Sequence, residues 1–371
     1  MAEPVPVLMM VRALDLGGTE RQLTEMARSL DPARFRVHVG AFHAAGFRAK
    51  ELWQAGIPVV EVPVRSFIRP DAIGGALVMG RYLERHRIRL VHTFDVPLNI
   101  FGVPVARLFR TPVVVSSQRA FRDLTPGFRR QLLRFTDRIV DAVVVNCQAV
   151  ARDMIERDGT PRSLIRWCPN GIDTSIFCSG GTPRSRPPEL EDASLVIGCI
   201  CALRPEKDLG LLLEAFGRLR GLRPGLRLAI VGSGPELPRL EERRRALGLE
   251  RDCVFVPATG EPAAWYRAME IFVLPSLSEA LSNSLMEAMA CGCAVAASNV
   301  GGNPELVAAG ETGLLFEPAN AEDLTEVLRA LILDDALRAR VSATASARMA
   351  QDFSVAVSAA RLASIYESLL R

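Results

Sequence analysis

Long hydrophobic runs are missing from this sequence of 371 residues. Its longest apolar stretches, such as Val113–Val115 and Ile271–Leu274, have the length of strands, whereas a membrane-spanning helix needs roughly 18 apolar residues. The first residues include the acidic Glu3 and lack the basic start and the cleavage site of a secretory signal. We therefore expect a cytoplasmic protein, and its 49% hydrophobic and 23% charged residues are typical of globular domains.

Spacings that bind metals are also absent. The sequence has four histidines, all within its first 92 residues, and eight cysteines, none before residue 147 and none in a C-x-x-C pattern. Structural zinc sites need four such ligands close together, so no metal site is expected. The pairs Cys199/Cys201 and Cys291/Cys293 lie in apolar segments, which favours small buried thiols in a reducing compartment.

Lysine is almost absent, because Lys50 and Lys207 are the only lysines among 45 basic residues. A lysine within a motif is therefore noticeable. The charge is also uneven along the chain. Residues 1–180 hold 25 basic and 17 acidic residues, whereas residues 181–371 hold 20 and 25, so the first half is basic and the second acidic.

Short apolar runs rich in β-branched residues alternate with longer amphipathic stretches. Strands that are apolar throughout and separated by helices indicate parallel sheets covered on both faces. The predicted strands form two series, Val7–Val11, Val37–Phe42, Val59–Val64, Leu90–Phe94, Val113–Ser117 and Ala142–Cys147, then Leu195–Cys201, Leu226–Val231, Cys253–Pro257, Ile271–Pro275 and Ala294–Ser298. The two series predict two doubly wound, Rossmann-like α/β domains in tandem.

A stretch rich in glycine, serine and proline, residues 178–192, separates the two series. We expect a first domain over 1–175, a linker over 176–192 and a second domain over 193–354. The amphipathic segment 355–371 is expected to form a C-terminal crossover helix that returns to the first domain. Because such sheets bind ligands at the carboxyl ends of their strands, a ligand is expected in an interdomain cleft.

Two glycine-rich loops follow predicted strands. Gly17-Gly18 comes after the first strand, and Gly232-Ser233-Gly234 ends a strand of the second domain and opens a helix. Glycines let the backbone approach a ligand closely, and the N-terminus of a following helix offers free N–H groups to an anion. The first loop has neither the Walker nor the dinucleotide spacing, so tight turns without a ligand stay an open alternative.

The loop Leu203–Asp208 follows the first predicted strand of the second domain and carries Arg204 and Lys207. A forked guanidinium and a mobile ammonium together suit a diphosphate. The alternative is a solvated turn in which Asp208 caps the next helix. From the loop alone the two interpretations are equally good.

Two carboxylates mark the stretch that follows Pro275. Glu279 is expected in a loop, and Glu287 about one turn inside an otherwise apolar helix that Ser282 or Asn283 can cap. A buried carboxylate needs a partner, and vicinal sugar hydroxyls can donate two hydrogen bonds to it. The N–H groups at the helix start can hold phosphate oxygens. A core salt bridge for Glu287 and a solvated loop for Glu279 remain the alternatives.

Seven residues separate Glu279 from Glu287, and Ala-Met-Ala-Cys-Gly and then Gly-Gly-Asn-Pro-Glu follow. This arrangement resembles the signature of the retaining glycosyltransferases of family 4. Further segments resemble the family's motifs in the same order, Gly17-Gly18-Thr19-Glu20-Arg21, Pro169-Asn170-Gly171-Ile172-Asp173, Leu203-Arg204-Pro205-Glu206-Lys207, Gly232-Ser233-Gly234-Pro235 and Gly310-Glu311-Thr312-Gly313. The resemblance spans nearly the whole chain, and the order and spacing of its motifs make it specific.

The resemblance implies the two-domain GT-B fold and a nucleotide-diphospho-sugar donor, a UDP- or GDP-sugar, without a cofactor. By the family's pattern, Glu279 faces the transferred sugar while Arg204 and Lys207 neutralise the diphosphate. The implied donor-binding residues are Gly17, Gly18, Gly232, Ser233, Gly234, Leu281, Ser282, Asn283, Ser284, Leu285 and Glu287, of which Glu287 would hold the ribose. Because the chain has no Asp-x-Asp motif, a metal-independent reaction is expected in which two cations neutralise the charge.

The sequence departs from the family's pattern at two places. Many relatives carry a histidine that touches the donor sugar after the strand that here is Val113–Ser117, where this chain has Gln118 and Arg119. His92, after another strand, is a candidate substitute on the acceptor or sugar side, although a hydrogen-bonded strand-end histidine is the favoured interpretation. Ala280 stands where the family usually has glycine, and its methyl group can narrow the sugar pocket.

The predicted function is that of a retaining hexosyl or N-acetylhexosaminyl transferase in cell-envelope or exopolysaccharide synthesis, with a glycan or lipid-linked glycan as acceptor. The segment 127–135 mixes phenylalanines with arginines, which favours peripheral contact with an anionic membrane at its inner face over nucleic-acid binding. An ordinary amphipathic helix is the alternative there. Two other functions stay open, a nucleotide-sugar epimerase or hydrolase on the same fold and a non-catalytic relative that binds nucleotide-sugar.

Overall fold

The computed structural model describes residues 3–67, 71–125, 127–180 and 186–371. The chain divides into two units. Unit 1 comprises Met1–Gly171 together with Val355–Arg371, and unit 2 comprises Ile172–Ser354. Within the described ranges, no helix combines the length and the apolar character that crossing a membrane would require.

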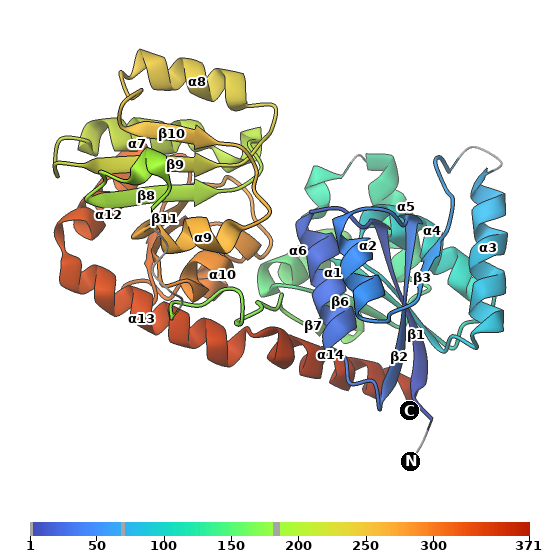
Figure 1. The fold of residues 1–371 in the computed structure, drawn as a ribbon. Coiled ribbons are helices and arrows are strands. Elements are labelled where there is room, and N and C mark those ends of the chain that lie inside the picture. Colours follow the sequence, from blue (N-terminus) through green and yellow to red (C-terminus); the bar gives the residue numbers. More distant parts are fainter. Residues whose placement is uncertain (1–2, 68–70, 126, 181–185) are drawn as a thin grey trace. The chain divides into compact units, whose positions relative to one another are not determined.

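Unit 1 is built on a seven-stranded parallel sheet with the order β3-β2-β1-β4-β5-β6-β7 (Figure 1). Its strands are β1 (Val5–Ala13), β2 (Phe35–His43), β3 (Val59–Glu61), β4 (Leu90–Thr93), β5 (Val113–Gln118), β6 (Ala142–Val145) and β7 (Ile165–Trp167). The central strands β4, β5 and β6 are buried along their whole length, as expected for strands covered on both faces. The strand order reverses beside β1, the position where such sheets bind ligands.

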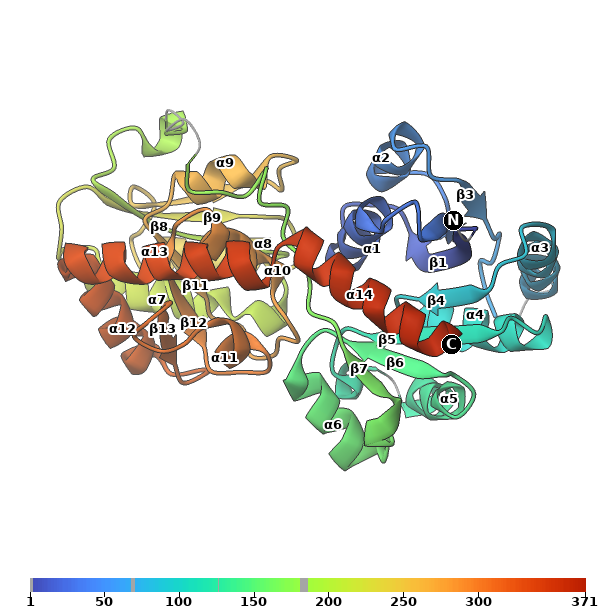
Figure 2. The same cartoon turned by 90° about the horizontal axis from the view of Figure 1, so that it is seen from below.

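Helices cover both faces of this sheet. On one face lie α1 (Gly18–Ser29), α2 (Phe47–Gln54) and α14 (Val355–Leu370), and on the other lie α3 (Asp71–Arg85), α4 (Val96–Leu108) and α5 (Gly127–Asp137). Helix α6 (Gln148–Asp158) connects β6 to β7. The last helix, α14, packs beside α1 (Figure 2), and its Leu362 and Tyr366 enter the core formed with β1 and β2.

Unit 2 is built on a six-stranded parallel sheet with the order β10-β9-β8-β11-β12-β13. Its strands are β8 (Leu195–Ile200), β9 (Leu226–Val231), β10 (Cys253–Val256), β11 (Ile271–Leu274), β12 (Ala294–Ser298) and β13 (Leu314–Phe316). Its helices are α7 (Leu209–Leu219), α8 (Leu237–Ala246), α9 (Pro262–Arg267), α10 (Asn283–Ala290), α11 (Asn303–Leu306), α12 (Ala321–Leu333) and α13 (Asp335–Asp352). Helix α7 contacts α8 and α12, and α10 contacts α9 and α13.

The two parallel sheets confirm the predicted fold class, but some elements went unpredicted. The strands β7 and β13 are three residues long and lie at sheet edges, and the helices α11 and α13 of unit 2 were not predicted. The expected strand Val59–Val64 ends at Glu61, because Pro63 has no N–H with which to continue a sheet ladder.

The chain changes from one unit to the other between Gly171 and Ile172 and returns between Ser354 and Val355. Most of the linker expected over 176–192 therefore clusters with unit 2. Its residues 181–185 lie outside the described residues. The short 3-10 helix Pro188–Leu190 brings Leu190 into the buried interior.

Candidate active site

Two loops meet at the carboxyl edge of the unit 2 sheet, because β8 and β11 are neighbouring strands. The loop after β8 leads into the 3-10 helix Pro205–Lys207, and the loop after β11 leads to α10. The Leu277 N–H donates to the Glu206 carbonyl at 2.8 Å and ties the two loops together. The topology thereby joins two sequence motifs that lie far apart along the chain.

An ion pair between Lys207 and Glu279 forms the centre of this site. The Lys207 ammonium donates to Glu279 Oε1, which also accepts a hydrogen bond of 2.8 Å from Ser276 Oγ. The side chains of Lys207 and Glu279 keep 18% and 11% of their surface exposed. Burial alone favours the neutral amine, but the adjacent Glu279 carboxylate outweighs it and raises the pKa of Lys207. Lys207 therefore carries a permanent positive charge in a mostly buried place.

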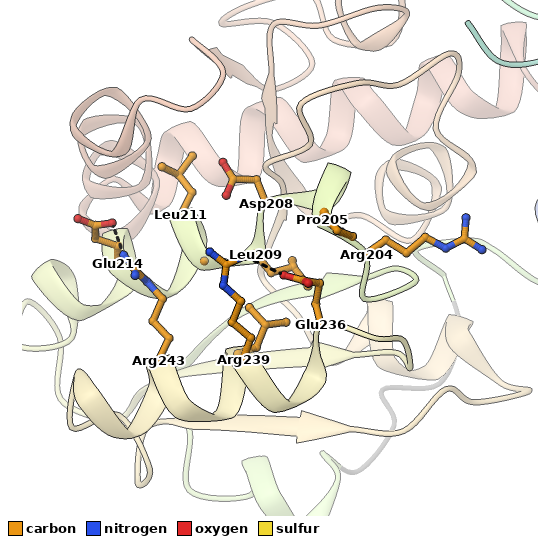
Figure 3. Close-up of a pocket in the computed structure, with 11 residues that line it drawn as sticks. Arg204, Pro205, Asp208, Leu209, Leu211, Glu214, Glu236, Arg239 and Arg243 are labelled. Atoms are coloured by element: carbon orange, nitrogen blue, oxygen red, sulfur yellow. Dashed lines mark hydrogen bonds and ion pairs between the residues drawn. The ribbon is translucent and has the colours of Figure 1, made fainter. Parts of the chain in front are cut away.

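Arg204 lies apart from this pair. Its side chain is 62% exposed, and its nearest carboxylate partner is Glu206, at 3.9 Å. Arg204 also lines a cavity of about 250 Å³ between the start of α7 and α8, but its guanidinium extends away from Arg239 and Arg243 (Figure 3). Those two arginines pair with acidic neighbours on the protein. The structure therefore brings Lys207 to Glu279 and leaves Arg204 in solvent.

The glycine loop after β9 packs directly on the segment that follows β8. A Cβ atom on Gly232, whose φ is +154°, would lie 1.9 Å from the Cys201 carbonyl oxygen, and one on Gly234 would lie 2.2 Å from the Leu203 carbonyl oxygen. The Leu203 N–H donates to the Ser233 carbonyl at 3.0 Å. Both glycines are thus required by the close approach of two chain segments, whatever ligand binds there.

Helix α10 begins beside the same loops. Of the two caps that the sequence allows, Ser282 is the N-cap, and its hydroxyl accepts a hydrogen bond from the Leu285 N–H at 3.4 Å. Asn283 and Ser284 form the first turn, and Leu281 is buried just before it. Glu287 is 3% exposed and therefore lies inside the protein. A carboxylate in such a place needs a polar partner.

The residue Ala280, which replaces the family's glycine, is held by main-chain contacts. The Gly302 N–H donates to the Ala280 carbonyl at 2.8 Å, so the glycine pair after β12 supports the loop that carries Glu279. The glycines of unit 1, Gly17 and Gly18, lie after β1 at the start of α1. A Cβ atom on Gly17 would lie 2.0 Å from the end of the Glu20 side chain, which would have to move aside to make room for it.

His92 is a fully hydrogen-bonded residue of the unit 1 core. Its Nδ1 pairs with the Tyr366 hydroxyl at 2.7 Å and its Nε2 with the Ser117 hydroxyl at 2.8 Å. Burial, assisted by the charge of Arg119, lowers the pKa of His92 to about 3, so the ring is neutral at physiological pH. This geometry matches the favoured interpretation of His92 as a satisfied strand-end residue.

Gln118 and Arg119 are also engaged by the protein. Gln118 is buried, accepts a 3.0 Å hydrogen bond from Arg122 Nε and donates to the Ala120 carbonyl. Arg119 donates to Asn170 Oδ1 at 2.5 Å and lies 5.7 Å from the ring centroid of Phe94. Burial lowers the pKa of Arg119 to about 10, so it stays charged. The end of β5 is therefore joined to the Pro-Asn-Gly motif.

A buried charge network that the sequence does not predict lies next to Gln118. Arg122 is 1% exposed and makes two hydrogen bonds to the Asp137 carboxylate, of 2.7 and 2.9 Å. Asp158 accepts from Arg122, Arg130 and Arg134. The sequence pattern gives no sign of this cluster, because its members come from the β5–α5 segment and from the end of α6.

Comparison with known proteins relates the chain to sugar transferases. Residues 16–176 match the family described as Glycosyltransferase Family 4, and residues 183–348 match Glycosyl transferases group 1. The D-inositol 3-phosphate glycosyltransferase of Corynebacterium jeikeium (strain K411) is 34% identical over 62% of this chain and 58% of its own length. The sulfoquinovosyl transferase SQD2 of Arabidopsis thaliana is 28% identical over 68% of this chain and 51% of its own length. The match thus spans little more than half of these two relatives.

A third relative is matched over more of its length. The lipopolysaccharide core biosynthesis mannosyltransferase LpsB of Rhizobium meliloti (strain 1021) is 30% identical over 64% of this chain and 68% of its own length. Among solved structures, Anabaena Alr3699/HepE in complex with UDP-glucose has a TM-score of 0.86, with 22% identity over 98% of this chain and 99% of that chain. The fold is accordingly GT-B, and the chain belongs to the family 4 glycosyltransferases, of the group 1 type.

Proposed function

We propose that this protein is a retaining, metal-independent glycosyltransferase that moves a hexosyl or N-acetylhexosaminyl group from a UDP- or GDP-sugar to a hydroxyl of a glycan or lipid-linked glycan. The observation that carries the proposal is the Lys207–Glu279 pair at the carboxyl edge of the unit 2 sheet. A cation that the fold places at this edge, beside a capped helix N-terminus, suits the diphosphate of a nucleotide-sugar. The acceptor would bind chiefly on unit 1.

Binding of the diphosphate requires Lys207 to exchange its partner. In the structure its ammonium is paired with Glu279, and a diphosphate oxygen would compete for the same protons. Arg204, which is largely solvent-exposed, can swing toward the same phosphates without losing a strong contact. The N–H groups of the first turn of α10, from Asn283 to Leu285, add the positive end of a helix dipole.

The two carboxylates take the sugars in this proposal. Glu287 is buried near the start of α10 and accepts hydrogen bonds from the ribose hydroxyls. Glu279, once Lys207 turns to the diphosphate, faces the hydroxyls of the transferred sugar. Gly232, Ser233 and Gly234 let the nucleotide approach the backbone closely.

The reaction follows from where charge develops. The acceptor hydroxyl attacks the anomeric carbon from the side of the departing diphosphate, and a leaving-group oxygen takes its proton. Negative charge grows on the diphosphate as the bond breaks, so Lys207 and Arg204 stabilise the transition state more than the ground state. Two cations then provide the neutralisation that a divalent metal provides in other transferases.

A role in envelope or exopolysaccharide synthesis and a peripheral membrane location complete the proposal. LpsB, as its name states, acts in lipopolysaccharide core biosynthesis. On α5 the side chains of Phe128 and Phe135, seven residues apart and thus on one side of the helix, are 71% and 53% exposed, with Arg129 exposed beside them. Exposed aromatic and basic side chains on one helix suit an anionic lipid surface.

Thermal unfolding in the presence of UDP, GDP or ADP, with and without EDTA, tests the proposal. A nucleotide that binds only the folded state raises the melting temperature with the logarithm of its concentration. We expect one nucleotide to raise it without any effect of EDTA, and Glu287→Ala to abolish the shift while its circular dichroism spectrum is unchanged. Glu287→Gln, which keeps the shape but not the charge, should retain a smaller shift. The absence of a shift with all three nucleotides in the wild type would contradict the proposed donor site.

A further inference from the structure

A pair of cysteine sulfurs lies at the carboxyl end of β8, immediately before the loop that carries Lys207. Cys199 lies in β8, and Cys201 directly follows Ile200, the last residue of that strand. The Cys199 thiol donates to Cys201 Sγ at a sulfur–sulfur distance of 3.7 Å. Cys199 is fully buried, whereas Cys201 is only half-buried. The pair thus combines one accessible thiol with one hidden behind it.

The surroundings of the two thiols differ in a way that assigns them different roles. Both sulfurs lie close enough to the Lys207 ammonium to interact with it electrostatically. A small disulfide can reach Cys201, which is half-buried, more readily than Cys199, which is fully buried. The hydrogen bond to Cys201, followed by burial, raises the pKa of Cys199 well above its usual range, so Cys199 stays a thiol until its neighbour has reacted. Cys201 is therefore the attacking sulfur, and Cys199 the resolving one.

We propose that Cys199 and Cys201 form a thiol modification site at which a low-molecular-weight disulfide converts the pair to an intramolecular disulfide. The Cys201 thiolate attacks one sulfur of the small disulfide, forms a mixed disulfide and releases the other half as a thiolate. Cys199 then gives up its proton, attacks Cys201 Sγ and releases the second half. Two protein thiols are oxidised and one small disulfide is reduced to two thiols, so electrons and protons balance.

Closing this disulfide must distort the end of β8. A disulfide bond is about 2.05 Å long, so the two sulfurs have to approach each other by about 1.6 Å. The Cys201 N–H is held at the same time by the Val231 carbonyl at 3.1 Å, as part of the sheet. A disulfide that joins Cys199 to a residue only two positions further along, while the Cys201 N–H stays bound to Val231, is strained, and strained disulfides are readily reduced. The modification is therefore reversible by ordinary thiols.

The distortion reaches the proposed donor site directly, and this consequence rests on the proposed function. Residues 201–203 support the glycine loop, since the Gly232 backbone lies against the Cys201 carbonyl and the Leu203 N–H donates to Ser233. The same segment leads into the turn that places Lys207. Oxidation of the pair would therefore weaken nucleotide binding, and a bound nucleotide would shield Cys201 from modification.

The test uses 5,5′-dithiobis(2-nitrobenzoate), an aromatic disulfide, on the full chain under native conditions, with mass spectrometry of the peptide that carries both cysteines. We expect the wild-type peptide to lose two hydrogens and to retain no thionitrobenzoate, because Cys199 resolves the adduct. Cys199→Ser should stop at a stable mixed disulfide on Cys201, and Cys201→Ser should leave Cys199 unmodified. Cys178→Ser, which removes a half-buried cysteine elsewhere in unit 2, should leave the wild-type result for the pair unchanged.

A stable adduct on wild-type Cys201, or no reaction of either thiol in the native protein, would overturn the proposal. The wild-type peptide map does not depend on whether the variants fold. Repeating the experiment with saturating UDP or GDP separates the proposal of a thiol modification site from the proposal of a nucleotide-sugar donor site. If the disulfide forms equally fast with and without nucleotide, and no nucleotide raises the melting temperature, the result would count against the donor site. The proposed thiol modification site would still be supported. Slowed modification of Cys201 together with unchanged labelling of Cys178 would support both.

Discussion

The carboxyl edges of the two parallel sheets hold polar side chains in opposite states. In unit 1, His92 and Gln118 are buried, and each is held by hydrogen bonds to other protein groups. In unit 2, Lys207 and Glu279 pair mainly through one contact and keep part of their surface in solvent. The first edge is closed by the protein itself, whereas the second has charged groups that a ligand can engage.

This difference separates scaffold from site on physical grounds. A buried charge or imidazole without its partner is costly, so the unit 1 network cannot exchange its contacts for a ligand cheaply. The Lys207–Glu279 pair is mostly buried, but a phosphate that replaces Glu279 keeps the Lys207 charge paired, and Glu279 still accepts a hydrogen bond from Ser276, so this exchange leaves no charge without a partner. Substitutions in unit 2 should therefore act on activity, and substitutions in unit 1 should act on stability.

The largest effect on activity is expected for Lys207→Ala. Removing one preorganised positive group from a developing charge costs on the order of 100-fold to 1,000-fold in turnover. Stability should also fall, because Glu279 is mostly buried and loses its cation, but by less than for a fully buried pair, since Glu279 keeps its hydrogen bond from Ser276 and some contact with solvent. Turnover of a nucleotide-sugar, measured together with the melting temperature, checks both halves of this expectation.

Lys50→Ala is the matched control, because Lys50 is the only other lysine and is exposed on α2. It should leave turnover and stability unchanged. Near-normal turnover of Lys207→Ala would contradict the proposal that Lys207, at the carboxyl edge of the unit 2 sheet, acts on the diphosphate. It would also contradict the distinction between the two sheet edges.

The largest effect on stability is expected for Arg122→Met in unit 1. This change leaves the buried Asp137 carboxylate without its cation and removes one of the arginines that bind Asp158. Breaking a buried pair in this way costs about 3–5 kcal/mol. Arg134→Met is the control, since Arg134 is 43% exposed and pairs with the same Asp158. We expect its cost to be within about 1 kcal/mol. The free energies of unfolding of both variants are measured with urea. Equal losses would mean that burial does not make the Arg122 ion pair more important for stability than the Arg134 ion pair.

The sequence predicts those features of the fold and site that depend on local pattern. The alternation of apolar runs with amphipathic stretches gives both parallel sheets, and Ser282 is recognisable as a helix cap from its own neighbourhood. The pairing of Lys207 with Glu279 joins residues 72 positions apart. Only the order of the strands places their loops together, and no local rule contains that order.

The same limit explains what the sequence places less well. The sequence places Arg204 and Lys207 in one loop and predicts that both act on a diphosphate, which stays a prediction, but it does not show that Arg204 has an extended backbone before the turn and a side chain in solvent. His92 finds its hydroxyl partner on Tyr366, 274 residues away. Its local sequence therefore cannot distinguish a core histidine from a catalytic one, although the structure does.

A moderate, pH-dependent effect is expected for His92. Its folded pKa of about 3 lies below the unfolded value of 6.5, so the unfolded chain binds the extra proton between these values. The contribution of neutral His92 to stability is therefore complete above pH 6.5 and is lost as the pH falls toward 3, by about 1.4 kcal/mol for each pH unit.

Comparison of the wild type with His92→Asn isolates this contribution. The variant should be less stable at pH 7.5, and the gap should narrow as the pH falls from 6.5 to 4.5. His38, whose pKa burial lowers to about 4, titrates in both proteins and so cancels from the difference. A gap that is constant with pH would mean that the imidazole is not held neutral, and that the unit 1 edge is more open than its hydrogen bonds indicate.

The smallest effect is expected on the outer surface of unit 1. The polar side chains at the carboxyl edge of the unit 1 sheet bind one another, so we expect any contact with lipid to involve an outer helix. On α5 the side chains of Phe128 and Phe135 are exposed. Their joint replacement by serine should weaken sedimentation with phosphatidylglycerol vesicles by about tenfold, since less apolar area enters the lipid. Leu108→Ser, at an equally exposed position at the end of α4, is the control and should change little. Equal losses for both variants would indicate non-specific adhesion, and binding that salt does not weaken would exclude the arginines of α5 as its cause, because contacts of exposed charges are screened.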